Sequence, residues 1–186
     1  KKKKILYELK KGYKVIKNFL SKEEVDLLTH YTRMRHRTNF DSFDLNQNNQ
    51  GDTMYYGDPA TDSVLISKIK LMEKETGLEL LPTYSFWRMY TYTADLKKHK
   101  DRPACEISVT VKINSCGVAW PIFIEGKKID LENGDGLIYK GCENFHWREE
   151  FKGDWHSQVF LHYVNKNGPN KEWYKDKRQL FGVLKN

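Results

Sequence analysis

The sequence has few cysteines, no long apolar run and no dense arginine patch, and each scarcity excludes a class of protein. Its three cysteines, Cys105, Cys116 and Cys142, form no CxxC pair, and an odd number does not supply a disulfide framework. No apolar run approaches the roughly 18 residues of a membrane span, and no apolar segment follows the N-terminal lysines as it would in a signal peptide. We therefore expect a soluble, cytoplasmic protein with reduced thiols and no membrane partner.

Positive charge is present but not concentrated. The formal net charge is +7, which permits binding to nucleic acid, to an anionic membrane or to acidic substrates. Much of the excess comes from lysines scattered near both ends of the chain, and the sequence contains no recognised nucleic-acid module. General solubility is the favoured reading of this charge, and a nucleic-acid partner stays open.

The length favours one domain. At 186 residues the chain suffices for one sizeable core, and the five Trp, eleven Tyr and nine Phe supply apolar material for it. We expect a single domain over residues 1–186, with helical support at about 12–80 and a β core at about 83–164. The tail at 165–186 is expected to be loop with little chemistry of its own.

The N-terminal half has two helix signals. Residues 12–20 have near-alternating apolar residues typical of a strand, and Ser21 to Glu24 then form a capping box before a helix. The polar stretch at about 38–57 lacks periodicity and predicts a long loop, as in a lid. Asp58 and Pro59 start a second predicted helix that ends at a Gly77 cap.

Short β-type runs separated by turn residues follow from Thr83 onward. They span residues 84–92, 105–113, 120–126, 128–131, 136–141 and 158–164. Two helices followed by short antiparallel strands favour an α+β arrangement, a β-sandwich or barrel with the N-terminal helices packed on one face.

The sharpest chemical feature is His99-Lys100-Asp101 at the end of a strand run. Alternation puts the His99 and Asp101 side chains on one face, and His146 follows a later strand, 45 residues beyond Asp101. Two imidazoles and one carboxylate make the facial triad of non-haem iron enzymes, which leaves three positions open. A zinc hydrolase would also need a general base, and no HExxH is present.

Several blocks together resemble a known family. The sequence R-M-Y-T-Y precedes H-K-D-R-P-A-C-E-I-S, and W-P-I-F-I-E-G, G-D-G-L-I-Y-K-G, H-W-R-E and Q-V-F-L-H-Y-V follow in order. Over residues 12–164 the chain resembles the prolyl-4-hydroxylase-like branch of the 2-oxoglutarate/Fe(II) oxygenases, especially small microbial and phage members. The resemblance implies a double-stranded β-helix, a cupin-like jelly roll with the metal at its open end. It also implies Fe(II), 2-oxoglutarate as co-substrate, O2, and hydroxylation of a C–H bond.

The resemblance assigns individual residues. His99, Asp101 and His146 match the metal ligands, and Tyr90 matches a tyrosine that lines the 2-oxoglutarate pocket. Arg88 and Tyr92 share the Tyr90 face by alternation, although core filling is favoured for Tyr92.

One position departs from the family. An arginine or lysine is expected about ten residues after the distal histidine, where it pairs with the far carboxylate of 2-oxoglutarate, and this chain has His156 there. The cation must then come from elsewhere, and the candidates are Arg88, Arg148 and Lys112. Arg88 is the first choice and Arg148 the second, although Arg148 could equally sit at the cavity mouth, where it would hold substrate or pair with Glu149. For Lys112 a solvated strand lysine is the favoured interpretation. His156 and Gln158 are expected to add hydrogen bonds in the pocket. Arg102 and Glu106 are expected to form an ion pair.

The substrate is left open. Likeness to prolyl hydroxylases favours a peptidyl proline or another peptide side chain, with a small molecule next. A nucleic-acid demethylase of the same chemistry is an alternative that the positive charge favours. A non-catalytic, cupin-like metal-binding or structural protein is another, and the missing cation at position 156 supports it.

Overall fold

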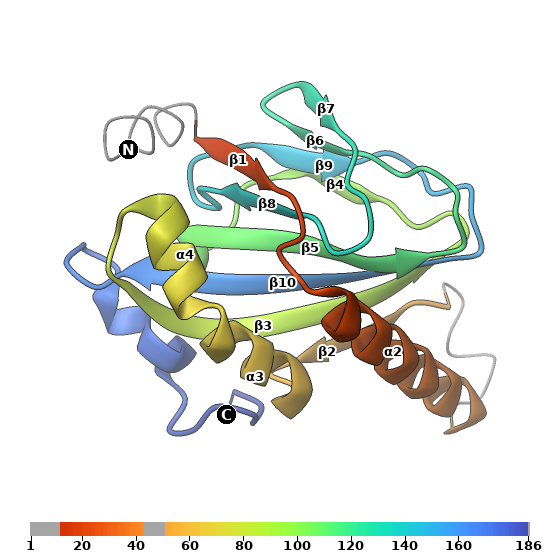
Figure 1. The fold of residues 1–186 in the computed structure, drawn as a ribbon, viewed down its shortest axis with the longest axis horizontal. Helices are drawn as coiled ribbons and strands as arrows, with labels where there is room; N and C mark the ends of the chain where they lie inside the picture. Colours follow the sequence, from red (N-terminus) through yellow and green to blue (C-terminus); the bar gives the residue numbers. More distant parts are fainter. Residues whose placement is uncertain (1–11, 43–50, 186) are drawn as a thin grey trace.

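The structure is a computed structural model that describes residues 12–42 and 51–185, with residues 37–42 described as backbone only. Strands dominate it, and helices are confined to the N-terminal half and two short 3-10 turns (Figure 1). No helix among the described residues is both long and apolar enough to cross a membrane. The elements are β1 (Tyr13–Ile16), α2 (Lys22–Ser42), β2 (Thr53–Tyr56), α3 (Pro59–Ser67), α4 (Ile69–Thr76), β3 (Leu80–Thr91), β4 (Leu96–His99), η1 (Pro103–Cys105), β5 (Ile107–Ser115), β6 (Ile122–Ile124), β7 (Lys127–Ile129), β8 (Gly136–Tyr139), β9 (His146–Arg148), β10 (Trp155–Asn165) and η2 (Lys171–Lys177).

The strands form two antiparallel sheets. The larger has the order β1-β8-β5-β10-β3-β2, and the smaller has the order β4-β9-β6-β7. The smaller sheet lies above the larger one in Figure 1, and residues of both sheets line one cavity. This is the expected α+β jelly roll, and the strand runs read from the sequence fall in it.

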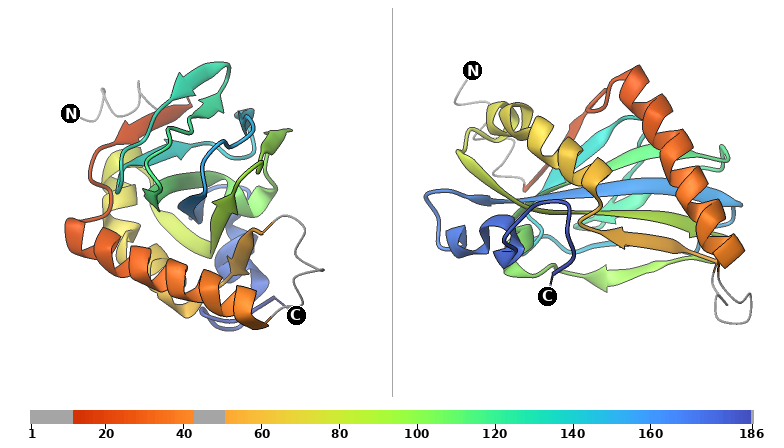
Figure 2. Two further views of the ribbon diagram at one scale, coloured as in Figure 1. Left: turned by 90° about the vertical axis from the view of Figure 1, so that its right-hand side faces the viewer. Right: turned by 90° about the horizontal axis from the view of Figure 1, so that it is seen from below.

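The helices pack on one face of the large sheet (Figure 2). Successive side chains of β3 point alternately toward these helices and away from them. On the helix side Trp87 and Met89 are 0% and 1% exposed and join Leu65 and Met72 in the main core. On the other side Arg88 and Tyr90 point into the space between the sheets. One strand thus supplies both the core and the wall of a cavity.

Both predicted helix starts are confirmed by their caps. The backbone N–H of Glu24 donates to Ser21 Oγ at 3.1 Å, and that of Ser21 donates to Glu24 Oε1 at 2.9 Å. Asp58 accepts from the N–H of Ala60, and Gly77 ends α4 at φ 72°. The single helix predicted between them is two, because the backbone of Lys68 leaves helical geometry at φ −93°, ψ 0°.

The prediction of a long loop at about 38–57 is wrong at both of its ends. Helix α2 continues to Ser42, and Thr53–Tyr56 forms β2, an edge strand paired with β3. Its aromatic residues suit a strand, and Tyr55 stacks on Trp87 with ring centroids 4.9 Å apart. Residues 43–50, the rest of that prediction, lie outside the described residues.

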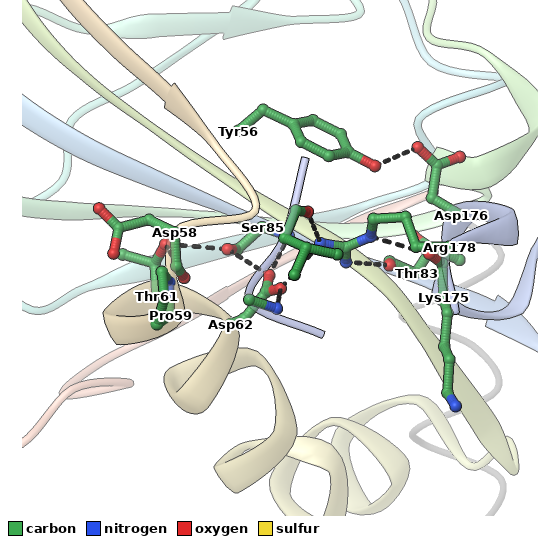
Figure 3. A network of polar contacts seen from close by, with 12 residues as sticks. Tyr56, Asp58, Pro59, Thr61, Asp62, Thr83, Ser85, Lys175, Asp176 and Arg178 are labelled. Carbon is green, nitrogen blue, oxygen red and sulfur yellow. Dashed lines mark hydrogen bonds and ion pairs between the residues drawn. The ribbon is translucent and has the colours of Figure 1, made fainter. Parts of the chain in front are cut away.

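The C-terminal tail is more than a loop, contrary to expectation (Figure 3). Arg178 is 7% exposed, and its Nη1 lies 2.9 Å from Asp62 Oδ2 on α3. Its Nη2 donates to the backbone oxygen of Thr83, and Asp176 is completely buried. The tail therefore packs through buried ion pairs, which hydrophobic periodicity does not reveal.

Candidate metal and co-substrate site

The two strands that carry the histidines pair directly. Strand β4 lies antiparallel to β9 with His99 opposite His146, and Asp101 follows β4 by two residues. The ligand atoms of these three side chains all lie within 4.8 Å of one another. His99 Nε2 is 3.2 Å and His146 Nε2 is 3.4 Å from Asp101 Oδ1. The structure therefore brings the three predicted ligands together.

Backbone oxygens orient both imidazoles. His99 Nδ1 lies 2.6 Å from the oxygen of Lys97, and His146 Nδ1 lies 3.0 Å from that of Asn144. A carbonyl oxygen accepts only, so each Nδ1 carries a hydrogen and each Nε2 faces Asp101 at the centre of the three residues. The rings are held as metal ligands require.

Asp101 supplies the negative charge. Burial by itself would raise the pKa of its carboxyl, but hydrogen bonds from His146 and His99 hold that pKa well below its usual range. The carboxylate is ionised at neutral pH. Two imidazoles and one carboxylate fit a divalent iron ion and leave coordination positions free for other ligands.

Gly141 holds the Asp101 backbone in place and has no room for a side chain. Its oxygen accepts from the N–H of Asp101 at 2.8 Å, and a Cβ here would lie 2.3 Å from the Cys105 oxygen and 2.9 Å from Asp101 Oδ2. We expect Gly141→Ala to weaken Co(II) binding by about tenfold or more and to lower stability by about 1–3 kcal/mol.

Cobalt titration and urea unfolding check this expectation. Gly168→Ala is the matched control, because its Cβ would meet a side-chain atom of Asn165 at 3.1 Å in the tail. Unchanged cobalt affinity in a folded Gly141→Ala protein would show that the backbone at Asp101 tolerates displacement.

A cavity of about 230 Å³ opens beside the three ligands. Its wall is largely aromatic, and His162 faces it. His162 is 5% exposed, and its Nδ1 lies 2.7 Å from Ser108 Oγ. The lining residues are Tyr84, Phe86, Arg88, Tyr90, Leu96, His99, Asp101, Tyr139, His146, Phe160 and His162.

Arg88 lines the cavity but its charge is already paired. Its Nε lies 2.9 Å from Asp52 Oδ2, its Nη2 contacts the same oxygen, and its Cζ lies 4.4 Å from the centre of the Tyr90 ring. Asp52 lies in the stretch read as a loop, so this partner was missed. Tyr92 is 58% exposed and not core as expected, because β3 ends at Thr91 and alternation stops there.

Arg148 is buried without a carboxylate partner among the described residues. It follows His146 by two positions on β9, so both side chains point inward, and it is 3% exposed. Its Nη1 donates to the oxygen of Trp120 at 2.5 Å, its Cζ lies 4.7 Å from the Trp120 ring centre, and its Nε has no partner. Burial lowers the pKa of Arg148 to about 10, so it stays charged at neutral pH. It does not pair with Glu149.

His156 and Gln158 lie in the same interior on β10. His156 Nε2 is 2.7 Å from Gln158 Oε1, and Gln158 Nε2 donates to Thr110 Oγ1 at 2.7 Å. The hydrogen of His156 is therefore on Nε2, and its Nδ1 has no partner. Burial and then the Arg148 charge lower the pKa of His156 far below its ordinary value, so the ring is neutral. Lys112 is half-buried, not solvated.

Because His156 stays neutral in the folded protein, the free energy of unfolding is expected to decrease at acid pH. When unfolded its pKa is near 6.5, so below pH 6.5 the unfolded chain takes up a proton that the folded protein does not. Below pH 6.5 the free energy of unfolding therefore decreases by about 1.4 kcal/mol per pH unit, which amounts to about 2 kcal/mol at pH 5. We expect His156→Gln to lose about 2 kcal/mol less than wild type between pH 7 and pH 5 in urea unfolding. The exposed His30→Gln is the control, and parallel losses in all three proteins would contradict a neutral buried His156.

The residue after Asp101, Arg102, also pairs differently from expectation. Arg102 binds Asp176 through both terminal nitrogens at 2.6 and 2.7 Å, and not Glu106. Glu106 accepts instead from the backbone N–H of Asn165. The partner is 74 residues away in sequence, beyond what local spacing reveals.

No protein-family model matches the chain, and no curated protein matches it in sequence. Solved structures do share its fold. An oxidoreductase of the 2OG-Fe(II) oxygenase family from Burkholderia pseudomallei has 12% identity and a TM-score of 0.64 over 91% of this chain and 92% of its own. A prolyl-4-hydroxylase from Pseudomonas putida has 18% identity and a TM-score of 0.62, with 88% and 98% covered.

A third structure was solved with ligands. HygX from Streptomyces hygroscopicus, with nickel and 2-oxoglutarate bound, has 10% identity and a TM-score of 0.66, with 88% and 87% covered. At these identities the likeness establishes the fold. The expected double-stranded β-helix, and the resemblance to structures of 2-oxoglutarate oxygenases that include prolyl hydroxylases, are confirmed at that level.

Proposed function

We propose that this protein is an Fe(II)- and 2-oxoglutarate-dependent oxygenase that hydroxylates a C–H bond. The observation that carries the proposal is the set of His99, Asp101 and His146, whose ligand atoms converge within 4.8 Å at the wall of a cavity. These three residues would hold the iron. When bound, the metal supplies the redox chemistry that couples oxidative decarboxylation of 2-oxoglutarate by O2, giving succinate and CO2, to oxygen insertion into the substrate.

Arg148 is our candidate for binding the far carboxylate of 2-oxoglutarate. It replaces the cation missing at position 156, and it lies two residues beyond His146, roughly 7 Å along the same strand. An isolated buried cation is costly, and an incoming carboxylate would provide the counter-charge that the described residues lack. Arg88, the first choice from sequence, has its charge paired with Asp52 in this structure.

Neighbouring side chains would complete the pocket. Tyr90 lines the cavity, and its ring centre lies 4.7 Å from that of Trp120, on which Arg148 stacks. Its hydroxyl would donate to the same carboxylate, since burial raises the pKa of Tyr90 and keeps it protonated. Gln158 and His156 would hold the far end of the pocket through their hydrogen-bonded pair.

The aromatic cavity wall suits a small apolar substrate group. Tyr84, Phe86, Tyr139 and Phe160 would exclude water from the reacting carbon. A side chain of proline size on a peptide fits this lining, and it is the substrate class we favour, with a small molecule next.

A nucleic-acid substrate is a second candidate, and one surface favours it. On the outer face of the small sheet Phe123 and Trp147 stack with ring centres 5.4 Å apart, and the Lys98 ammonium lies 5.0 Å from the Trp147 ring centre. Aromatic rings beside lysines are typical of surfaces that bind single strands. Steeply salt-dependent binding to oligonucleotides would select this candidate.

The proposed activity is tested without knowing the substrate. The protein is incubated with 2-oxoglutarate, O2 and ascorbate, with and without Fe(II), and succinate is measured. We expect slow succinate formation that requires iron. No iron-dependent succinate from folded protein that binds iron would favour a non-catalytic, cupin-like metal-binding protein.

A further inference from the structure

The residue after the proposed metal ligand Asp101 is Arg102, and its guanidinium could compete with the metal for the Asp101 carboxylate. A guanidinium stays protonated and forms strong two-point pairs with carboxylates. Arg102 has a half-exposed side chain beside the cavity, with its Cζ 4.6 Å from the ring centre of the cavity residue Tyr84. An unrestrained Arg102 could therefore pair with Asp101 and take the carboxylate from the metal.

The C-terminal segment supplies a different carboxylate for Arg102. Asp176 has 0% side-chain exposure and accepts from both Arg102 terminal nitrogens, at 2.6 and 2.7 Å. Tyr56 donates to its Oδ2 at 2.5 Å, and the Lys185 ammonium lies 3.5 Å from its Oδ1. The Tyr56–Asp176 bond is drawn in Figure 3, where both side chains meet beside the tail.

The backbone that presents Asp176 is unusual. Lys175, Asp176 and Lys177 have φ values of 57°, 54° and 62°, three successive non-glycine residues in the left-handed region. Such residues are disfavoured and persist only where surrounding contacts hold them. The contacts here are the Arg102 pair, the Tyr56 hydrogen bond, and bonds from the Arg178 N–H and Nε to the Lys175 oxygen at 3.1 and 2.9 Å.

We propose that Asp176 is a positioning residue of the metal site, which holds the Arg102 guanidinium away from Asp101 so that the Asp101 carboxylate remains free for the metal. The proposal rests on the metal site of the proposed function, and assigns Asp176 no contact with metal or substrate. It links the C-terminal segment to the site through one ion pair.

Cobalt binding to the metal-stripped full chain, followed by visible absorption, tests the proposal. We expect Asp176→Asn to weaken Co(II) binding by about tenfold or more, in the range seen when supporting partners of metal ligands are lost. Adding Arg102→Gln to Asp176→Asn should restore wild-type affinity, because no guanidinium is left to compete. Arg102→Gln alone should bind cobalt as wild type does.

A matched control breaks a neighbouring buried pair of the same segment. Asp62→Asn disrupts the Asp62–Arg178 pair, 2.9 Å apart, and should lower the melting temperature without changing cobalt affinity. Unchanged affinity in Asp176→Asn, or a double variant as weak as Asp176→Asn, would overturn the proposal in favour of a purely structural role. If Asp176→Asn does not fold, weakened binding by Arg102→Gln alone would overturn it, and wild-type binding would support it. Absence of cobalt binding by the wild type would instead refute the metal site itself.

Discussion

Replacing His99 with alanine is expected to reduce iron-dependent conversion of 2-oxoglutarate to succinate to the level measured without iron. The variant removes one of the three ligand atoms that lie within 4.8 Å of one another. Metal affinity should fall by about a hundredfold or more, because losing even a supporting partner of a ligand costs about 10- to 100-fold. Fold stability should change little, since His99 lies at the end of an edge strand with 35% of its side chain exposed.

The matched control is His30→Ala, which removes an exposed histidine of α2 outside the site. It should retain both metal affinity and succinate formation. Turnover that survives in His99→Ala at the wild-type rate would remove His99 from the catalytic metal site.

Replacing Arg148 with methionine is expected to have opposite effects on co-substrate binding and on stability. Removing one partner of a buried charge pair costs about 2–5 kcal/mol, so 2-oxoglutarate affinity should fall by roughly a hundredfold. The ligand-free protein should be as stable as wild type or more stable, because methionine fills similar space without burying an unpaired charge. Calorimetric titration with Mn(II)-loaded protein gives the first quantity, and urea unfolding gives the second.

Arg88→Met provides the contrast. It leaves Asp52 without the guanidinium that pairs with it, so stability should fall while 2-oxoglutarate affinity changes far less. If Arg88→Met loses affinity and Arg148→Met keeps it, the far carboxylate binds at Arg88, the first choice from sequence.

The strands and the cluster of His99, Asp101 and His146 could be predicted from the sequence because both depend on local order. Alternation along β3 correctly placed Arg88 and Tyr90 on one face of the strand, and both line the cavity. The spacing of His99 and Asp101, with His146 after a later strand, indicated a site that the β4–β9 pairing forms. Alternation failed at Tyr92, where the strand had already ended.

The charge pairs could not be read, because their partners are far apart in the chain. Asp52 lies 36 residues before Arg88, and Asp176 lies 74 residues after Arg102. No local pattern connects such residues, and only the packed fold shows that Arg88 is neutralised while Arg148 is not. The choice between these two arginines therefore changed with the structure. The close approach of Gly141 to Asp101 was hidden for the same reason.

Anaerobic addition of Fe(II) and 2-oxoglutarate to the purified protein tests the central claim most directly. If His99, Asp101 and His146 hold iron with adjacent positions open, the keto acid chelates the metal and a weak visible charge-transfer band appears. The band should grow with 2-oxoglutarate concentration and be absent in His99→Ala. A folded wild-type protein that binds Fe(II) and gives no such band at saturating 2-oxoglutarate would contradict the assignment.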